Sequence, residues 1–135
     1  MPSPHNTLSK SERLKSRKVI EQLFREGRSF QLFPFVVYYL PQPHADQWLR
    51  AGFGVSSRNF KKAVNRNRVK RLTREAFRIQ KHELEALLKS QNKMLSVFFI
   101  YTGKELPEQE FVSKKIAAAL QRLIKLTNET PDASA

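Results

Sequence analysis

Cysteine and long apolar runs are absent from this chain, and each absence excludes a class of protein. Without cysteine the chain has no disulfide, no thiolate metal site and no thiol nucleophile. No apolar run approaches the roughly 20 residues that a membrane-spanning helix needs, and the segment 1–13 lacks the apolar core of a signal peptide. We therefore expect a cytoplasmic protein with no membrane partner.

Acidic residues are also scarce, which leaves the chain strongly basic. Twelve Asp and Glu residues stand against 25 Lys and Arg residues, so the net charge is +13 and the isoelectric point is near 10.4. A hydrophobic content of 40% over 135 residues is nevertheless typical of one packed domain and not of a disordered polycation. A folded and basic protein indicates nucleic acid as its partner.

The residues that usually carry catalysis are scattered. His5, His44 and His82 lie far apart in the sequence, and the acidic residues are spaced like solubilising positions of helices and loops. The GFG stretch at 52–54 is neither a phosphate loop nor a complete dinucleotide fingerprint. We therefore expect no catalytic residue, no metal site and no cofactor bound by the protein alone.

The positive charge is concentrated in one segment. Residues 58–81 include ten basic residues and one acidic residue, so they carry +9 of the net charge. On a helical wheel the basic residues fall opposite an apolar stripe. The expected stripe is Val69, Leu72, Ala76, Ile79 and Leu87.

Like charges on one helix face lower helix stability, whereas a merely solvated face mixes signs. The pattern therefore predicts a basic ridge that binds the phosphates of a polyanion. Structured RNA is favoured over duplex DNA, because a helix held in a sandwich cannot enter the major groove as a free rod.

Hydrophobic periodicity predicts an α+β sandwich in which helices pack on a small mixed sheet. The expected elements are a flexible arm over 1–8, a helix from Ser9 or Ser11 to Gly27, strands over 35–40 and 49–56, a helix over 62–89, a central strand over 94–101, a helix from Leu106, and a polar tail over 128–135. The last helix should bury Phe111, Ile116, Ala119, Leu120, Leu123 and Ile124. Residues 9–127 are thus expected to form a single RNA-binding domain.

Aromatic residues on the strands are core residues by default, but Tyr38 differs from its neighbours. Because successive side chains of a strand point to opposite faces of the sheet, Tyr38 should lie on the face opposite Phe35, Val37 and Tyr39. Because a base can stack on an exposed ring, Tyr38 is the favoured stacking platform.

The stretch KKAVNRNRVKRLTREAFR, residues 61–78, closely resembles the signature of the protein subunit of bacterial ribonuclease P. The resemblance extends over RLKSRKVIEQLFREG, PFVVYYL, LRAGFGVS and MLSVFFIY, and so over most of the chain. It implies a fold like ribosomal protein S5 domain 2, with the order αβββαβα and therefore one further short strand. It also implies a left-handed βαβ crossover, where general rules favour a right-handed one.

The resemblance implies a role in 5′ maturation of precursor tRNA, within a ribonucleoprotein endonuclease whose RNA subunit carries the chemistry with bound magnesium. The expected partners are the ribonuclease P RNA subunit and precursor tRNA, and DNA is not expected to bind. The protein alone is expected to be a monomer. The residues implied to face the RNA subunit are Arg58, Lys61, Lys62, Arg66, Asn67, Arg68, Lys70, Arg71 and Arg74. Asn67 is also a candidate cap for its helix.

A cleft for the single-stranded 5′ leader is implied as well. Its expected lining is Arg13, Arg17, Ile20, Phe24, Phe35 and Tyr38, beside the bare backbone of Gly52 and Gly54. Ile20 stands where the family usually has an aromatic residue, and Ser57 where a lysine is common. The alternatives are a ribosomal or ribosome-assembly protein that binds ribosomal RNA, and a DNA-binding regulator.

Overall fold

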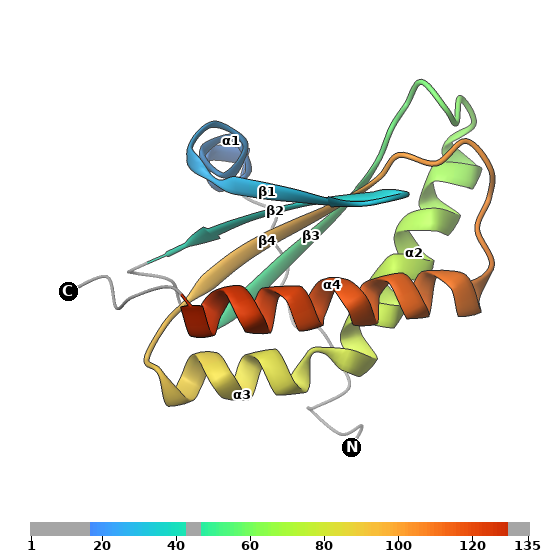
Figure 1. Cartoon of the computed structure of the whole chain (residues 1–135). Coiled ribbons are helices and arrows are strands. Elements are labelled where there is room, and N and C mark those ends of the chain that lie inside the picture. The colour runs from blue at the N-terminus through green and yellow to red at the C-terminus, as the bar shows by residue number, and fades with distance from the viewer. Residues whose placement is uncertain (1–16, 43–46, 130–135) are drawn as a thin grey trace, which may run out of the picture.

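A four-stranded sheet with helices on both faces organises the fold (Figure 1). The computed structural model describes residues 17–42 and 47–129. In chain order the elements are α1 (Arg17–Glu26), β1 (Arg28–Leu32), β2 (Phe35–Pro41), β3 (Leu49–Val55), α2 (Ala63–Gln80), α3 (His82–Ser90), β4 (Leu95–Tyr101) and α4 (Gln109–Glu129). The predicted α+β sandwich is confirmed, and β1 is the short strand that the resemblance implied.

The strands lie in the order β1-β2-β4-β3. β1 pairs with β2, and β2 with β4, in antiparallel fashion, whereas β3 and β4 are parallel neighbours. β4 is central, as its near-continuous apolar sequence predicted, because such a strand must be covered on both faces. The helices α2 and α3 form the crossover from β3 to β4; its left-handedness stays a prediction.

Alternation along β2 separates the two faces of the sheet. Phe35 and Val37 are buried on the face where the core packs. Tyr38 points to the opposite face, where its ring lies 4.9 Å from that of Phe24 in α1. Figure 1 shows α1 on one side of the sheet and α2, α3 and α4 on the other. The fold is therefore layered, with α1 alone on the second face among the described helices.

The helix predicted over 62–89 is two helices that meet at Lys81. Neither glycine nor proline marks the junction, so the sequence carries no local signal for it. Lys81 itself is only 2% exposed, and the preceding Gln80 donates a hydrogen bond of 3.1 Å to the backbone oxygen of Ser113 in α4. Tertiary contacts with α4 thus hold the chain at the point where it changes direction.

The ends of the helices match the predictions only in part. α1 ends at Glu26, before Gly27 as predicted. The expected helix start at Ser9 or Ser11 and the arm over 1–8 lie outside the described residues. α4 begins at Gln109, later than predicted, and continues to Glu129, into the segment expected to be a tail.

One predicted core position of α4 is wrong. Phe111 is 41% exposed, and the neighbouring Val112 is buried in its place. Val112 shares its helix face with the buried Ile116 and Leu120, whereas Phe111 is displaced by one position, about 100°, from that stripe. The ammonium of Lys115 lies 5.7 Å from the centre of the Phe111 ring, so the exposed ring has a cation beside it.

Candidate nucleic-acid interface

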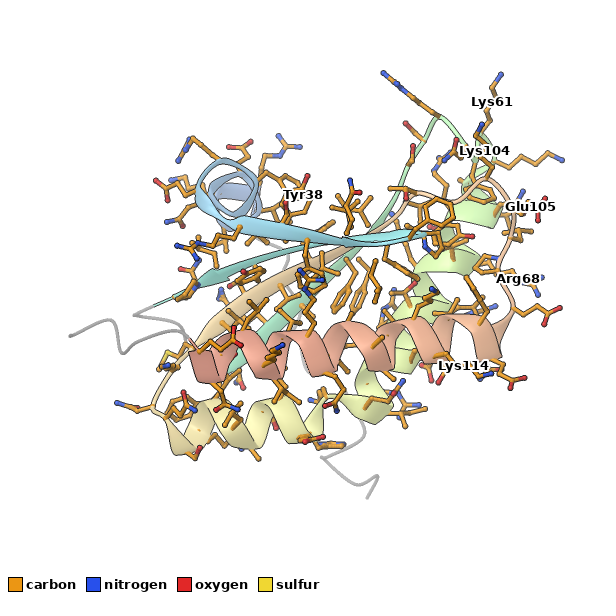
Figure 2. The ribbon with its side chains drawn as sticks, viewed as in Figure 1. Tyr38, Lys61, Arg68, Lys104, Glu105 and Lys114 are labelled. Atoms are coloured by element: carbon orange, nitrogen blue, oxygen red, sulfur yellow. The ribbon has the colours of Figure 1, made fainter. Side chains whose placement is uncertain are left out.

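Basic residues gather on α2 and on the loop before it, in a surface that we call the basic ridge. Its members are Arg58, Lys61, Lys62, Arg66, Arg68, Lys70, Arg71 and Arg74. Figure 2 shows Lys61 at the end of the molecule where α2 begins, and Arg68 farther along that helix. A hollow on the helix surface is lined by Val64, Asn65, Asn67, Arg68, Lys70, Arg71 and Arg74. The structure therefore brings together five of the predicted residues, Asn67, Arg68, Lys70, Arg71 and Arg74.

The side chains of the basic ridge have no anionic partner among the residues that the structure describes. Within residues 17–42 and 47–129, every ridge side chain except that of Arg66 has no hydrogen bond or ion pair to a protein group. Arg78, one turn beyond the ridge, differs because its guanidinium lies 2.6 Å from the carboxylate of Glu75. Apart from Arg66, the cations of the ridge are thus not neutralised or hydrogen-bonded by described protein groups, an arrangement that suits contacts with phosphates.

Arg66 has a structural part in this surface. Its guanidinium donates hydrogen bonds of 2.7 and 2.8 Å to the backbone oxygens of Phe60 and Lys61. These bonds fold the basic loop back against the first turns of α2. The helix begins after Lys62, which makes no side-chain capping bond. Asn67 lies more than one turn inside the helix, so the predicted capping role is wrong, and its exposed side chain lines the hollow instead.

The buried face of α2 is rotated from the predicted stripe. Val69 and Ala76 are buried as expected, but Ile79 is 56% exposed. Phe77 and Thr73 occupy the core instead. The Phe77 ring lies 5.5 Å from that of Phe99, and burying this larger side chain releases more free energy than burying Ile79.

Thr73 can be buried because its hydroxyl is satisfied within the helix. It donates a hydrogen bond of 2.9 Å to the backbone oxygen of Val69. The rotation leaves Lys70 and Arg74 half-buried at the border of the core, whereas Arg68 and Arg71 are exposed. The two exposed arginines are therefore the most accessible cations in the middle of the ridge.

A second candidate surface lies on the opposite face of the sheet, beneath α1. The Phe24 ring meets that of Tyr38 at 4.9 Å and that of Phe98 at 5.3 Å, both edge to face. We call these three residues the aromatic surface; Figure 2 shows Tyr38 on the side where α1 lies. Phe24 is 43% exposed, and Tyr38 and Phe98 are half-buried. Rings of this kind can stack with unpaired bases.

The structure divides the residues predicted for the leader cleft. Arg17, Ile20 and Phe24 lie on α1, and Tyr38 faces that helix. Phe35 is a correction: it is 1% exposed and packs at 5.3 Å against Tyr101, in the core on the other face of the sheet. Strand alternation is the physical reason, since three positions along a strand reverse the side-chain direction. Arg13 lies outside the described residues.

Two glycines of β3 do not offer the bare backbone that the sequence indicated. Gly52 is buried. At Gly54 an added Cβ would come within 2.9 Å of the Phe98 ring, so the glycine makes room for that ring. Phe98 was missed from the sequence because it belongs to a near-continuous apolar strand, where alternation leaves little signal.

Other features of the described residues bear on chemistry. Within 17–42 and 47–129, no three His, Cys, Asp or Glu side chains are grouped closely enough to hold a metal ion. None of the helices in these ranges is both long and apolar enough to cross a membrane.

Burial, with the nearby charge of Glu105, raises the pKa of the Tyr101 hydroxyl, which stays a hydrogen-bond donor at neutral pH.

Comparison with known proteins gives a consistent result. The family model described as Ribonuclease P matches residues 8–124. The chain is 38% identical over 117 residues to the ribonuclease P protein component of Porphyromonas gingivalis (strain ATCC 33277), an alignment that covers 86% of this chain and 85% of that protein.

Solved structures agree with the sequence comparison. The RNase P protein from Thermotoga maritima superposes with a TM-score of 0.63 at 29% identity, covering 82% of this chain and 96% of that chain. The RNase P protein of Staphylococcus aureus gives a TM-score of 0.57 at 25% identity, with 86% and 94% covered. Sequence and fold therefore point to the same family.

Proposed function

The chain belongs to the ribonuclease P protein family, and on that premise we propose that it is the protein component of a ribonuclease P that removes the 5′ leader of precursor tRNA in the cytoplasm. The observation that carries this proposal is the basic ridge, whose cations, apart from Arg66, lack protein partners among the described residues. RNA binding to a surface of this kind is favourable, because the cations of the protein neutralise phosphates and release the counterions condensed on the RNA.

The basic ridge is the proposed docking surface for the RNA subunit. Arg68 and Arg71 are exposed on α2, and their planar guanidinium groups suit two-pronged contact with phosphate oxygens. Arg66 holds the preceding loop against the helix through its bonds to Phe60 and Lys61. The loop and the helix can therefore act together as one RNA-binding unit.

The aromatic surface is the proposed contact for the 5′ leader. It lies on the face of the sheet that α1 covers, opposite the face that packs against α4. Arg17 and Ile20 lie on α1, the helix that also carries Phe24. Single-stranded RNA is bound by rings that stack with its bases and by cations that contact its backbone. The ridge and the aromatic surface would then hold two different RNAs.

We place the hydrolytic chemistry in the RNA subunit. Magnesium ions bound by that RNA would supply the charge that activates water and stabilises the leaving group. The part assigned to this protein is to bind and orient RNA, because the described residues offer no grouped set of metal ligands. Under this proposal the protein is a component of an endonuclease, and the protein itself has no active site.

Cleavage of precursor tRNA at low magnesium is the direct test. The cognate ribonuclease P RNA should cleave efficiently only when this protein is added, and the protein alone should be inactive. If the protein binds that RNA tightly yet does not promote cleavage, the proposal fails and a ribosomal-RNA-binding role takes its place.

The leader contact can be tested with one tyrosine. Tyr38→Ala should weaken holoenzyme binding to precursor tRNA by about 1 kcal/mol, roughly fivefold, and leave binding of mature tRNA unchanged. Tyr38→Phe is the matched control, because it keeps the stacking ring and should bind like the native protein. Equal losses for precursor and mature tRNA would refute the leader assignment.

A further inference from the structure

Two loops that are distant in sequence meet at one end of the molecule. One loop, 56–62, follows β3 and leads into α2, and the other, 102–108, follows β4 and leads into α4. Because β3 and β4 are parallel neighbours, the loops that follow them leave the sheet at the same edge. The Ser56 backbone N–H donates to the Tyr101 oxygen at 3.1 Å, which joins the two loops at their base.

The side chain of Asn59 joins the loops farther out. Its amide nitrogen donates to the backbone oxygens of Thr102 and Gly103 at 3.0 and 3.2 Å. A side-chain amide suits this position because its NH₂ group carries two hydrogens for two acceptors. An aspartate here would instead set carboxylate oxygens against two carbonyl oxygens.

Contacts from Tyr101 fix the second loop. The Tyr101 hydroxyl donates a hydrogen bond of 2.7 Å to the backbone oxygen of Glu105, and the ring lies 6.1 Å from that of Phe60 in the first loop. Gly103 sits so close to the Tyr101 hydroxyl that no Cβ could be added without displacement. The backbone on both sides of Lys104 is thus held by named contacts.

Lys104 is exposed within this supported loop. Figure 2 shows Lys104 and Lys61 at the same end of the molecule, with Lys114 away from them on α4. Within the described ranges, the Lys104 ammonium has no hydrogen bond or ion pair, like the cations of the ridge other than Arg66. The Lys114 ammonium, by contrast, lies 3.6 Å from the carboxylate of Glu110.

We propose that the RNA-binding surface continues from the basic ridge onto the loop between β4 and α4, where Lys104 contacts the phosphate backbone of the same RNA and Asn59 positions it. This inference rests on the proposed function of the ridge. Lys104 adds a contact that lies outside the α2 segment, and the partner is recognised by its phosphates. Asn59 acts as a positioning residue, because its amide hydrogens are used within the protein.

The first test compares three alanine variants in binding to the cognate ribonuclease P RNA over a range of salt concentrations. Lys104→Ala should weaken binding about three- to tenfold and lower the slope of log affinity against log salt by about 0.7 to 0.9, the value of one phosphate contact. Lys114→Ala is the matched control and should change neither quantity. Arg68→Ala is the reference for the ridge and should lower both.

The outcomes separate the two hypotheses. If Arg68→Ala lowers affinity while Lys104→Ala behaves like Lys114→Ala, the extension of the surface is wrong and the ridge stands. If Arg68→Ala also has no effect, the ridge hypothesis fails and this inference fails with it.

The role of Asn59 needs a double-mutant cycle, because Asn59→Ala also alters loop structure. If Asn59 positions Lys104, the affinity lost on Asn59→Ala should shrink to less than half in the Lys104→Ala background. A purely structural role gives the same loss in both backgrounds and would overturn the assignment. Thermal unfolding of each variant verifies that the compared proteins are folded.

Discussion

The helices α2 and α3 are consecutive, yet they differ in the charge of their first turns. α3 has Glu83 and Glu85 in its first turn and Lys89 in its last, an arrangement that complements the helix dipole. Glu85 also lies 3.8 Å from the ammonium groups of both Lys81 and Lys89. α2 has no acidic residue in its first turn. The first turns of α2 thus depart from the rules of helix stability that α3 follows, which is one reason why we propose α2 as the RNA-binding surface.

Packing explains how α2 tolerates its own charge. Val69 and Phe77 are essentially fully buried on its inner face, and burying side chains of this size stabilises by about 1.5–3 kcal/mol each. A like-charge pair four residues apart costs only about 0.2–0.5 kcal/mol. Tertiary burial therefore outweighs the repulsion of the ridge, so the outer face of α2 can carry like charges without unfolding the helix.

The largest effect should follow from removing charge on α2. The double variant with Arg68→Ala and Arg71→Ala should bind ribonuclease P RNA about a hundredfold more weakly, because two charged hydrogen-bonding groups are lost. The salt slope should fall by roughly 1.4 to 1.8. Lys89→Ala, on α3, is the matched control and should change affinity less than about twofold. Similar losses in both proteins would abolish the distinction between the helices.

Breaking the ion pairs of α3 should act on stability and not on binding. Glu85→Gln leaves the ammonium of Lys81, which is 2% exposed, without its carboxylate neighbour, and should lower the free energy of unfolding by about 1–3 kcal/mol. Urea denaturation measures this change. Glu110→Gln breaks the exposed pair with Lys114 and should cost less than about 1 kcal/mol. A marked loss of RNA affinity in Glu85→Gln would contradict the comparison.

Adding an acidic residue among the cations of α2, as in α3, should raise the stability of the protein but lower its affinity for RNA. Asn67→Glu introduces a carboxylate four residues before Arg71, which should stabilise the protein by about 0.2–0.5 kcal/mol. The same carboxylate should weaken RNA binding about tenfold, since it competes with phosphate and repels it. Asn67→Gln controls for side-chain length. Unchanged RNA affinity would show that this part of α2 is not in the interface.

A small effect on both stability and RNA binding is expected at the junction of the two helices. The Gln80 amide donates to the backbone oxygens of Ala76 and Ser113, both at 3.1 Å, and so ties the end of α2 to α4. Gln80→Ala should lower the free energy of unfolding by about 0.5–1.5 kcal/mol and change RNA affinity less than threefold. A larger loss of affinity would mean that the bend at Lys81 sets the direction of the ridge.

Strand alternation was a better guide to the sheet than residue-by-residue transfer from the family. It placed Tyr38 on the face opposite Phe35, Val37 and Tyr39, and the ring contact with Phe24 agrees with that placement. The resemblance put Phe35 beside Tyr38, but Phe35 is buried in the core. Alternation is a consequence of backbone geometry, so it holds in each strand regardless of how relatives vary.

The sequence by itself determined the basic segment, the order of the main elements and the opposite faces of Phe35 and Tyr38, because charge and periodicity are local properties of the chain. Only the tertiary structure decided that the α2 stripe turns toward Thr73 and Phe77, that the helix divides at Lys81, and that Phe98 fills the space over Gly54. Each of these outcomes depends on which side chain fits best against a distant element. Pairing of β3 with β4 likewise brings Asn59 to Thr102 and Gly103, a contact between segments more than 40 positions apart that no local pattern contains.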